Sequence, residues 1–444
     1  MPDPPEASPL ADLELALSLS RADRAADAAL RAFRAEASPV DVVRAAVRAA
    51  ASRYDPAAGL APHALAALEA AGGLADVLDA RQRPLPVLQA IALAAAEKKL
   101  SVPQRPAAVV SGEVTHLGRS ALLAARAGDR RELEALFLGI VDEGWERRMA
   151  GEVLFRASLE DPGEAGHKLL TSVALWRLAR ALGFRDARTT LRPAVQYLGA
   201  GEPVRRPHAV MMSVLGKEWV DLEILVSGGK PLDERGRGRL ATSVAAPTEE
   251  ACVTSILALL QEGYAVASLG EGIGIEASKR VLAGEGYHLE LVHALLFARA
   301  AHFVLEFSTS SERAYALFQA ALRVRSPAPH LPSVAVSEPA GEAEALRNVA
   351  EDLATRRPRE AAAHVRAYLA RGHAPRALAA LLAYHASLDS ALANQGHNLL
   401  LAEACTAEFA TTHAPEFLMA LAKTVAASPK DVTASKAWSA ALGP

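Results

Sequence analysis

A short pattern occurs four times along this chain: an Ala-Ser pair near the end of an apolar helix, a short loop, and a histidine that opens a second apolar helix. The serine and the histidine of each copy are separated by 9 to 11 residues. The four pairs are Ser52 and His63, Ser158 and His167, Ser278 and His288, and Ser387 and His397. A histidine that recurs in four otherwise diverged copies indicates one shared site at the centre of the molecule.

Longer repeated units surround these histidines. The segments 263–288 and 372–397 align without a gap, and each is 26 residues long. Apolar residues recur at i, i+3, i+4 and i+7, which predicts four helices in each unit. In the first unit these helices are expected at 22–35, 39–52, 60–80 and 84–98, and the four units at about 22–98, 131–200, 248–325 and 357–428.

The units are expected to form one assembly. A unit of this size has more apolar surface than it can bury alone, so the copies must pack on one another. We therefore predict an all-α fold over residues 1–444, with four diverged four-helix repeats around a central site. The segment 205–248 contains LEILVSGGKPLDERGRGR, which is rich in glycine and charge. It is expected to be a helix-poor insert, either a lid over a pocket or a solvated connector.

Composition and charge exclude several classes of partner. The formal net charge is −3, with 48 basic and 51 acidic residues spread along the chain, so no basic surface for nucleic acid is expected. There is no run of 18 uncharged apolar residues and no leader-like N-terminus, which predicts a cytoplasmic protein without membrane contact. Cys252 and Cys405 lack any framework spacing and are expected to be buried thiols.

A histidine at the start of a helix is suited to metal binding. The unpaired N–H groups and the positive end of the helix dipole disfavour an imidazolium, so the ring there tends to be neutral with a free lone pair. Neutral imidazole is a ligand that iron, zinc and other divalent metals accept. Four equivalent helix starts that meet on one axis would bring His63, His167, His288 and His397 to one ion. In the third unit His293 and His302 lie nearby, and either could replace or support His288.

Other polar residues are candidates for roles beside the metal. Glu276 and His385 occupy one column of the second helix of their units, where the first unit has Ala50. A column that changes from alanine to ionisable residues indicates a proton-transfer or orienting role, so both are predicted to be catalytic. Glu69 and Glu403 each follow a histidine by six residues, about 240° around the helix, so they cannot share a metal face with it; a role in supporting the ligands from behind, or an exposed position, is expected.

The sequence lacks the common motifs of other enzyme classes. The glycines of 270–274 resemble a phosphate loop only in number, because no strand precedes them and no Lys-Ser/Thr follows. No HExxH or GxSxG pattern occurs. A zinc protease and a serine hydrolase are therefore unsupported.

The order of the histidine segments resembles the questin oxidase-like family, helical proteins of aromatic polyketide metabolism. The matching stretches are APHALAALEA around His63, GHKLLTSVALWRLARALG around His167, and YHLELVHALLF around His288 and His293. The resemblance implies a mononuclear non-haem iron held by several histidines, a carboxylated lysine as a further ligand, and oxygenation of anthraquinone-type substrates with O₂. No lysine clearly matches the family lysine, because His364-Val365-Arg366 stands at that place, and Lys423 and Lys279 are weak substitutes.

Two hypotheses from different classes follow. The first is an Fe(II) oxygenase, with Zn(II) or another divalent metal as the alternative ion, in which His63, His167, His288 or His293, and His397 hold the metal beside a hydrophobic aromatic substrate. The second is a non-catalytic scaffold that resembles HEAT-type repeat proteins and binds a peptide or protein on a concave surface. They differ in one point, because only a metal site requires the histidines to meet.

Overall fold

The protein is described from a computed structural model that covers residues 8–142, 147–200, 203–331, 334–336 and 339–442. Within these ranges the chain forms 24 α-helices and no strands, which confirms the all-α prediction. None of the described helices is both long and apolar enough to cross a membrane. Cys252 and Cys405 are buried free thiols, as predicted.

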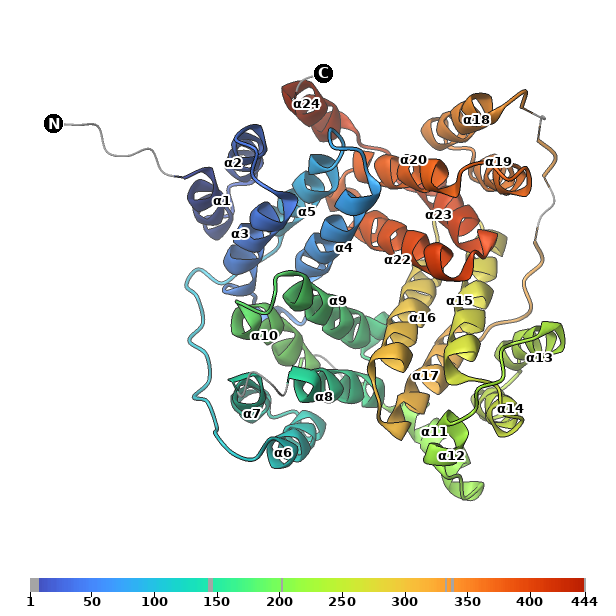
Figure 1. Cartoon of the computed structure of the whole chain (residues 1–444). Helices are drawn as coiled ribbons and strands as arrows, with labels where there is room; N and C mark the ends of the chain where they lie inside the picture. The colour runs from blue at the N-terminus through green and yellow to red at the C-terminus, as the bar shows by residue number, and fades with distance from the viewer. Residues whose placement is uncertain (1–7, 143–146, 201–202, 332–333, 337–338, 443–444) are drawn as a thin grey trace.

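Four helices surround the centre of the molecule (Figure 1). They are α4 (His63–Val77), α9 (His167–Ala181), α16 (Leu289–Phe307) and α22 (His397–Thr412). Each contacts the next in the order α4, α9, α16 and α22, and α22 contacts α4 again. Most of their residues are buried, whichever face of the helix they lie on, as expected for helices that are enclosed by others.

The outer helices cover this inner group. Each predicted unit span contains four helices of 11 to 19 residues, one of which belongs to the inner group. The outer members are α2 (Ala22–Arg34), α3 (Pro39–Ala51), α5 (Pro84–Ala96), α7 (Arg130–Asp142), α8 (Arg147–Glu160), α10 (Ala187–Leu198), α14 (Glu249–Gln261), α15 (Val266–Ala283), α17 (Ala314–Val324), α19 (Pro358–Ala370), α20 (Pro375–Leu388) and α23 (Pro415–Ala427). That the four groups are copies of one unit stays a prediction.

The remaining elements join or extend these groups. They are α1 (Pro9–Ser18), α6 (Val114–Ala127), α11 (Arg206–Lys217), α12 (Leu222–Val226), α13 (Glu234–Val244), α18 (Glu342–Ala354), α21 (Ala391–Asn394), α24 (Thr433–Leu442) and three short 3₁₀ turns, Pro56–Ala58, Glu164–Gly166 and Ser311–Arg313.

The two ends of the chain meet, so the arrangement is closed. α20 contacts α4 and α5, and α24 contacts α2 and α5. The Arg34 side chain donates from Nε to the carbonyl of Ala441 over 3.0 Å. A closed ring differs from an open solenoid because its inner surface is buried by its own helices rather than left for a partner.

The segment 205–248 is helical, which corrects the prediction of a helix-poor insert. Asp221 and Asp233 accept hydrogen bonds from the backbone N–H groups of the first turns of α12 and α13, and this capping starts helices in a glycine-rich sequence. Leu240 and Val244 of α13 are buried against the core. The segment is therefore packed against its neighbours rather than a solvated connector.

Candidate metal centre

Four histidine rings form a closed group at the start of the inner helices. They are His63, His167, His293 and His397. Ring centroids of successive members are 5.0 Å (His63 to His167), 4.6 Å (His167 to His293), 4.7 Å (His293 to His397) and 5.3 Å (His397 to His63) apart. The Nε2 atoms of His63 and His167 are 3.2 Å apart, and those of His293 and His397 are 2.8 Å apart.

The backbone before the helices orients two of these rings. Nδ1 of His167 donates to the carbonyl of Glu164 over 2.9 Å, and Nδ1 of His397 donates to the carbonyl of Asn394 over 2.7 Å. A ring that donates from Nδ1 and is neutral carries its lone pair on Nε2. Both Nε2 lone pairs therefore point into the group, as the ligands of a metal site would.

His293, and not His288, supplies the fourth ring. His288 is the exposed N-cap of α16, whereas His293 is buried one helical turn later. The ungapped alignment placed His288 in the histidine column, but α16 has about one more turn at its start than the other inner helices. Of the alternatives for the third unit, His302 is also outside the group, since its Nδ1 lies 3.0 Å from the Glu408 carboxylate.

The spacing of His63, His167 and His397 fits one ion, and Nε2 of His293 lies 2.8 Å from that of His397. One ligand nitrogen each of His63, His167 and His397 lies within 4.8 Å of the others, so this group could hold a metal. Two nitrogens that are each about 2.1 Å from one metal are about 3.0 Å apart at a right angle and about 3.4 Å apart at a tetrahedral angle. The two Nε2 separations, 3.2 and 2.8 Å, are close to these values. The donors fit a divalent transition metal, which neutral imidazole binds well.

Burial keeps the four imidazoles neutral. It is the main cause that lowers the pKa of His63 to about 3, of His293 to about 2 and of His397 to about 4, and neighbouring histidines lower each of them further. Burial also lowers the pKa of His167. Each neutral ring has one nitrogen with a free lone pair, which is the form of histidine that binds a metal.

These pKa values predict a pH dependence of folding. An ordinary histidine titrates near 6.5, so between about pH 4 and 6.5 the unfolded chain binds protons that the folded histidines exclude. The free energy of unfolding of the metal-free protein should be highest above pH 6.5, where these histidines are neutral in both the folded and the unfolded chain. It should fall by about 1.4 kcal/mol per pH unit for each histidine as the pH decreases below 6.5. We expect His293→Leu to flatten this slope in urea unfolding between pH 5 and 7. His330→Gln, at an exposed position, serves as the control, and an equal slope in both variants would contradict the assignment.

Gly166 allows the approach of α9 to α16. Its φ is +85°, a left-handed conformation that glycine adopts without strain, and a Cβ at this position would lie 2.3 Å from Cδ2 of Phe297. Gly396 precedes His397 in a similar conformation, with φ +78°. The glycines before these two histidines thus permit the tight helix starts that bring the rings together.

Gly166→Ala should therefore disturb both the fold and the histidine group. The added methyl group requires a left-handed alanine, at about 1–2 kcal/mol, and an overpacked contact with Phe297, at about 1–3 kcal/mol. Gly183→Ala is the matched control, because Gly183 has φ +70° and open space where the Cβ would lie. Urea unfolding should show the larger loss for Gly166→Ala. Equal losses in the two variants would mean that the contact with Phe297 does not constrain the helix start.

A small cavity of about 60 Å³ adjoins the histidines. Its apolar wall includes Ala66, Leu170, Leu296 and Leu400, each three residues after one of the four histidines. This repeated offset shows that one face of each inner helix is turned toward the same axis. The cavity has room for one or two water molecules or a molecule of similar size.

Charged residues close the other end of this cavity. The Arg177 guanidinium donates to both carboxylate oxygens of Glu403 and lies 3.1 Å from Glu69. The carboxylates are buried, with Glu69 9% and Glu403 8% exposed. Burial raises the pKa of Glu69. Burial acts on Glu403 in the same direction, but the charge and hydrogen bonds of Arg177 outweigh it and lower the pKa of Glu403.

The ionic contacts continue into the core from there. Arg299, which also lines the cavity, is 2.8 Å from Glu408, and Glu408 accepts from Nδ1 of His302. Arg177 and Arg299 were not singled out in the sequence. A signal was present, since Arg299 follows His293 by six residues, the same offset as Glu69 from His63 and Glu403 from His397.

The position of Glu69 and Glu403 corrects the angular argument made from the sequence. An offset of six residues does place them on another side of the helix from the histidine. The inner face, however, is centred on the residues three, six and seven positions after the histidine, and the histidine lies at its edge. Both glutamates are therefore buried at the histidine cavity, so the alternative of an exposed position is wrong.

The two residues predicted to be catalytic are not at this cavity. Glu276 of α15 is buried with its carboxylate 2.8 Å from Lys279 and 3.0 Å from Arg280. His385 of α20 is partly buried, and burial lowers its pKa to about 4. Neither lines the cavity, because the helices that carry them form the outer layer. Local ion pairs explain why this column holds a glutamate at position 276, while nothing in the structure explains His385.

No lysine lines the histidine cavity within the described part of the chain. The Lys423 ammonium is buried between α15 and α23 and donates to the carbonyls of Val281, over 2.6 Å, and Gly284. Lys279 pairs with Glu276. Neither lysine is therefore placed to supply the carboxylated ligand that the family resemblance implies.

Comparison of the chain with protein families, with curated proteins and with solved structures gives no match.

Proposed function

We propose that this protein is a mononuclear non-haem iron oxygenase that acts with O₂ on a hydrophobic, aromatic, polyketide-like small molecule. One observation carries the proposal: one ring nitrogen each of His63, His167 and His397 lies within 4.8 Å of the others, Nε2 of His293 is 2.8 Å from that of His397, and burial keeps these rings neutral. Iron is preferred among the divalent metals because of the resemblance to the questin oxidase-like family, since the imidazole donors suit zinc as well.

The chain would contribute in two ways. The carbonyls of Glu164 and Asn394 hold two of the imidazoles in the orientation and tautomer that a metal requires. The bound iron would supply the activation of O₂. Arg177 with Glu69 and Glu403 forms a fixed ionic wall at the far end of the cavity, where burial raises the pKa of Glu69 to about 7 and so suits it to exchange a proton with a bound molecule.

The cavity accommodates O₂ but not a polyketide as it stands, because its volume is about 60 Å³ and ligand pockets for drug-sized molecules are about 300–1,000 Å³. The proposal therefore requires a change of shape when the substrate binds. Leu296 and Leu400 line the cavity next to the histidines, and rotation of these side chains would enlarge it.

The alternative, a HEAT-like scaffold, receives less support. Such a protein needs an exposed concave surface, whereas the inner helices here are covered on their outer side and face one another on the inner side. A scaffold also provides no reason for four imidazoles to meet in the core.

Oxygen uptake tests the proposal. The iron-loaded protein is mixed with each member of a panel of hydroxyanthraquinones, and O₂ consumption is recorded together with loss of the quinone absorbance. We expect uptake that depends on substrate and falls at least about 100-fold in His397→Ala, because a missing ligand removes the metal on which the reaction depends. Absence of uptake by an iron-loaded parent protein across the panel would contradict an oxygenase.

A further inference from the structure

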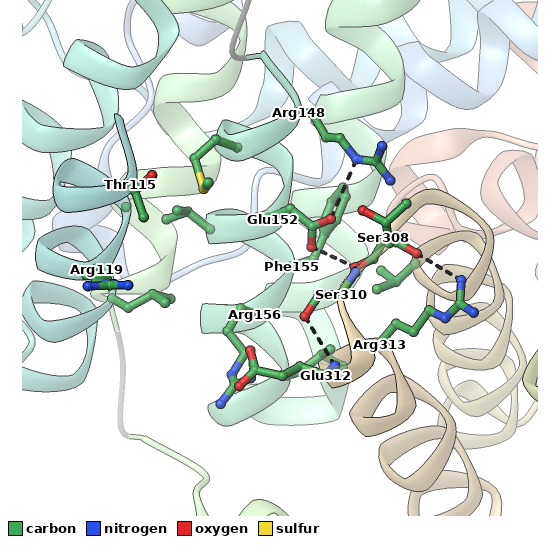
Figure 2. Close-up of a pocket in the computed structure, with 17 residues that line it drawn as sticks. Thr115, Arg119, Arg148, Glu152, Phe155, Arg156, Ser308, Ser310, Glu312 and Arg313 are labelled. Carbon is green, nitrogen blue, oxygen red and sulfur yellow. Dashed lines mark hydrogen bonds and ion pairs between the residues drawn. The ribbon is translucent and has the colours of Figure 1, made fainter. Parts of the chain in front are cut away.

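A second and larger cavity lies away from the histidines. It measures about 430 Å³ and is formed by α6, α8, the end of α16 and the Ser311–Arg313 turn (Figure 2). It shares no lining residue with the histidine cavity. Its volume is within the range of about 300–1,000 Å³ that is usual for small-molecule sites.

The floor of this cavity is apolar. Phe155, Val153, Leu159 and Val304 are 1 to 2% exposed and present aliphatic and aromatic surface to the space. Leu122 and Met149 are half-buried and extend this surface toward the rim. A ligand that enters gains free energy from the apolar area it removes from water, about 25 cal/mol for each Å².

The polar lining has an excess of positive charge. It contains four arginines and two glutamates, which gives 4 − 2 = +2. Glu312 pairs with Arg156, and Glu152 accepts a hydrogen bond of 2.8 Å from the Ser308 hydroxyl. Both carboxylates thus already have partners, so neither is free for a cationic ligand.

Arg119 differs from the other arginines of the cavity. Arg148, Arg156 and Arg313 donate to carbonyls or carboxylates, whereas Arg119 has no hydrogen bond or ion pair within the described part of the chain. Figure 2 shows Arg119 and Thr115 on one wall, across the cavity from Ser310, Glu312 and Arg313. Thr115 precedes Arg119 by one helical turn, so its hydroxyl lies on the same side of α6.

We propose that this cavity binds a small amphipathic carboxylate, with the carboxylate on the Arg119 guanidinium and the hydrocarbon part over Phe155 and Val153. The planar guanidinium matches a carboxylate with two parallel hydrogen bonds, and the net positive lining attracts an anion. The same positive lining would repel a cation. Arg119 is exposed, and a neutral ligand of equal shape would lack the charge-assisted hydrogen bonds that its guanidinium can donate to a carboxylate.

Calorimetry with two probes of the same shape tests this site. Metal-free protein is titrated with 2-naphthoate and with the neutral 2-naphthamide. We expect saturable binding of naphthoate and at least about tenfold weaker binding of the amide, since hydrogen bonds to charged groups contribute more than neutral ones. Arg119→Ala should weaken naphthoate binding at least about tenfold, and Arg119→Lys by less, because lysine keeps the charge but loses the paired geometry.

Three control variants distinguish binding in this cavity from binding elsewhere on the protein. Arg131→Ala removes an exposed arginine of α7 that does not line the cavity, and it should leave the affinity unchanged. Leu122→Trp should block both probes by filling the space. His167→Ala should bind naphthoate like the parent protein, so failure of the metal proposal would not affect this result. Equal affinity for the two probes, unchanged binding by Arg119→Ala, or no saturable binding of naphthoate would each overturn the proposal.

Discussion

Arg177→Met is expected to lower the free energy of unfolding by about 3–5 kcal/mol, because it leaves two buried carboxylates without their cation. Glu69 of the neighbouring α4 and Glu403 of α22, across the inner group, both pair with Arg177, and both are almost fully buried. The methionine keeps most of the volume of the arginine side chain, so the loss reports charge rather than a cavity. Urea unfolding at pH 7 provides the measurement.

The matched control is Arg188→Met. Arg188 pairs with Asp142 in an ion pair of comparable geometry, but its side chain is 60% exposed, and exposed pairs contribute about 0–1 kcal/mol. Adding Glu69→Gln and Glu403→Gln to Arg177→Met should recover much of the stability, since the uncompensated charges are then gone. A loss in Arg177→Met no larger than that of the control would show that the ionic wall does not depend on this arginine.

Replacement of one histidine by alanine is expected to abolish high-affinity metal binding. An ion that binds only the folded state raises the free energy of unfolding by about 2.7 kcal/mol when present at 100 times its Kd. In the parent protein, Fe(II) added without oxygen should raise the melting temperature accordingly. His167→Ala and His397→Ala should lose this increase, because each removes a ligand and the orienting hydrogen bond behind it.

His330→Ala serves as the comparison, because His330 is exposed and outside the histidine group. It should keep the full increase in melting temperature on addition of Fe(II). If all three variants respond to Fe(II) as the parent protein does, the ion binds elsewhere or only weakly, and the converging histidines are structural residues.

The sequence predicted the helices better than the residues around the site. The spans of the first unit agree with α2, α3, α4 and α5 to within about three residues at each end, since apolar periodicity and prolines define such boundaries well. The start of the third helix was placed at residue 60, whereas α4 begins at His63 after Pro62. The recurrence of an isolated histidine also predicted the meeting of His63, His167 and His397.

Other features depended on where each helix starts and how the helices are arranged in space, which residue spacing does not reveal. Of the two alternatives left open in the third unit, the extra turn at the start of α16 places His293, and not His288, in the histidine group. The prediction for Glu276 and His385 assumed that the second helix of each unit faces the site, whereas these helices lie in the outer layer. The pairing of Arg177 with Glu69 and Glu403 joins three different inner helices, and no local pattern of one helix encodes such a contact.

The metal content of the purified protein shows whether the converging histidines hold one metal ion. The full chain is expressed with added iron, purified without oxygen, and analysed by emission spectrometry against protein concentration. We expect about one iron per chain, because a closed set of neutral imidazoles should retain its ion through purification. Less than about 0.2 metal ions of any kind per chain would contradict this expectation, because a preformed site of this kind should not remain largely empty.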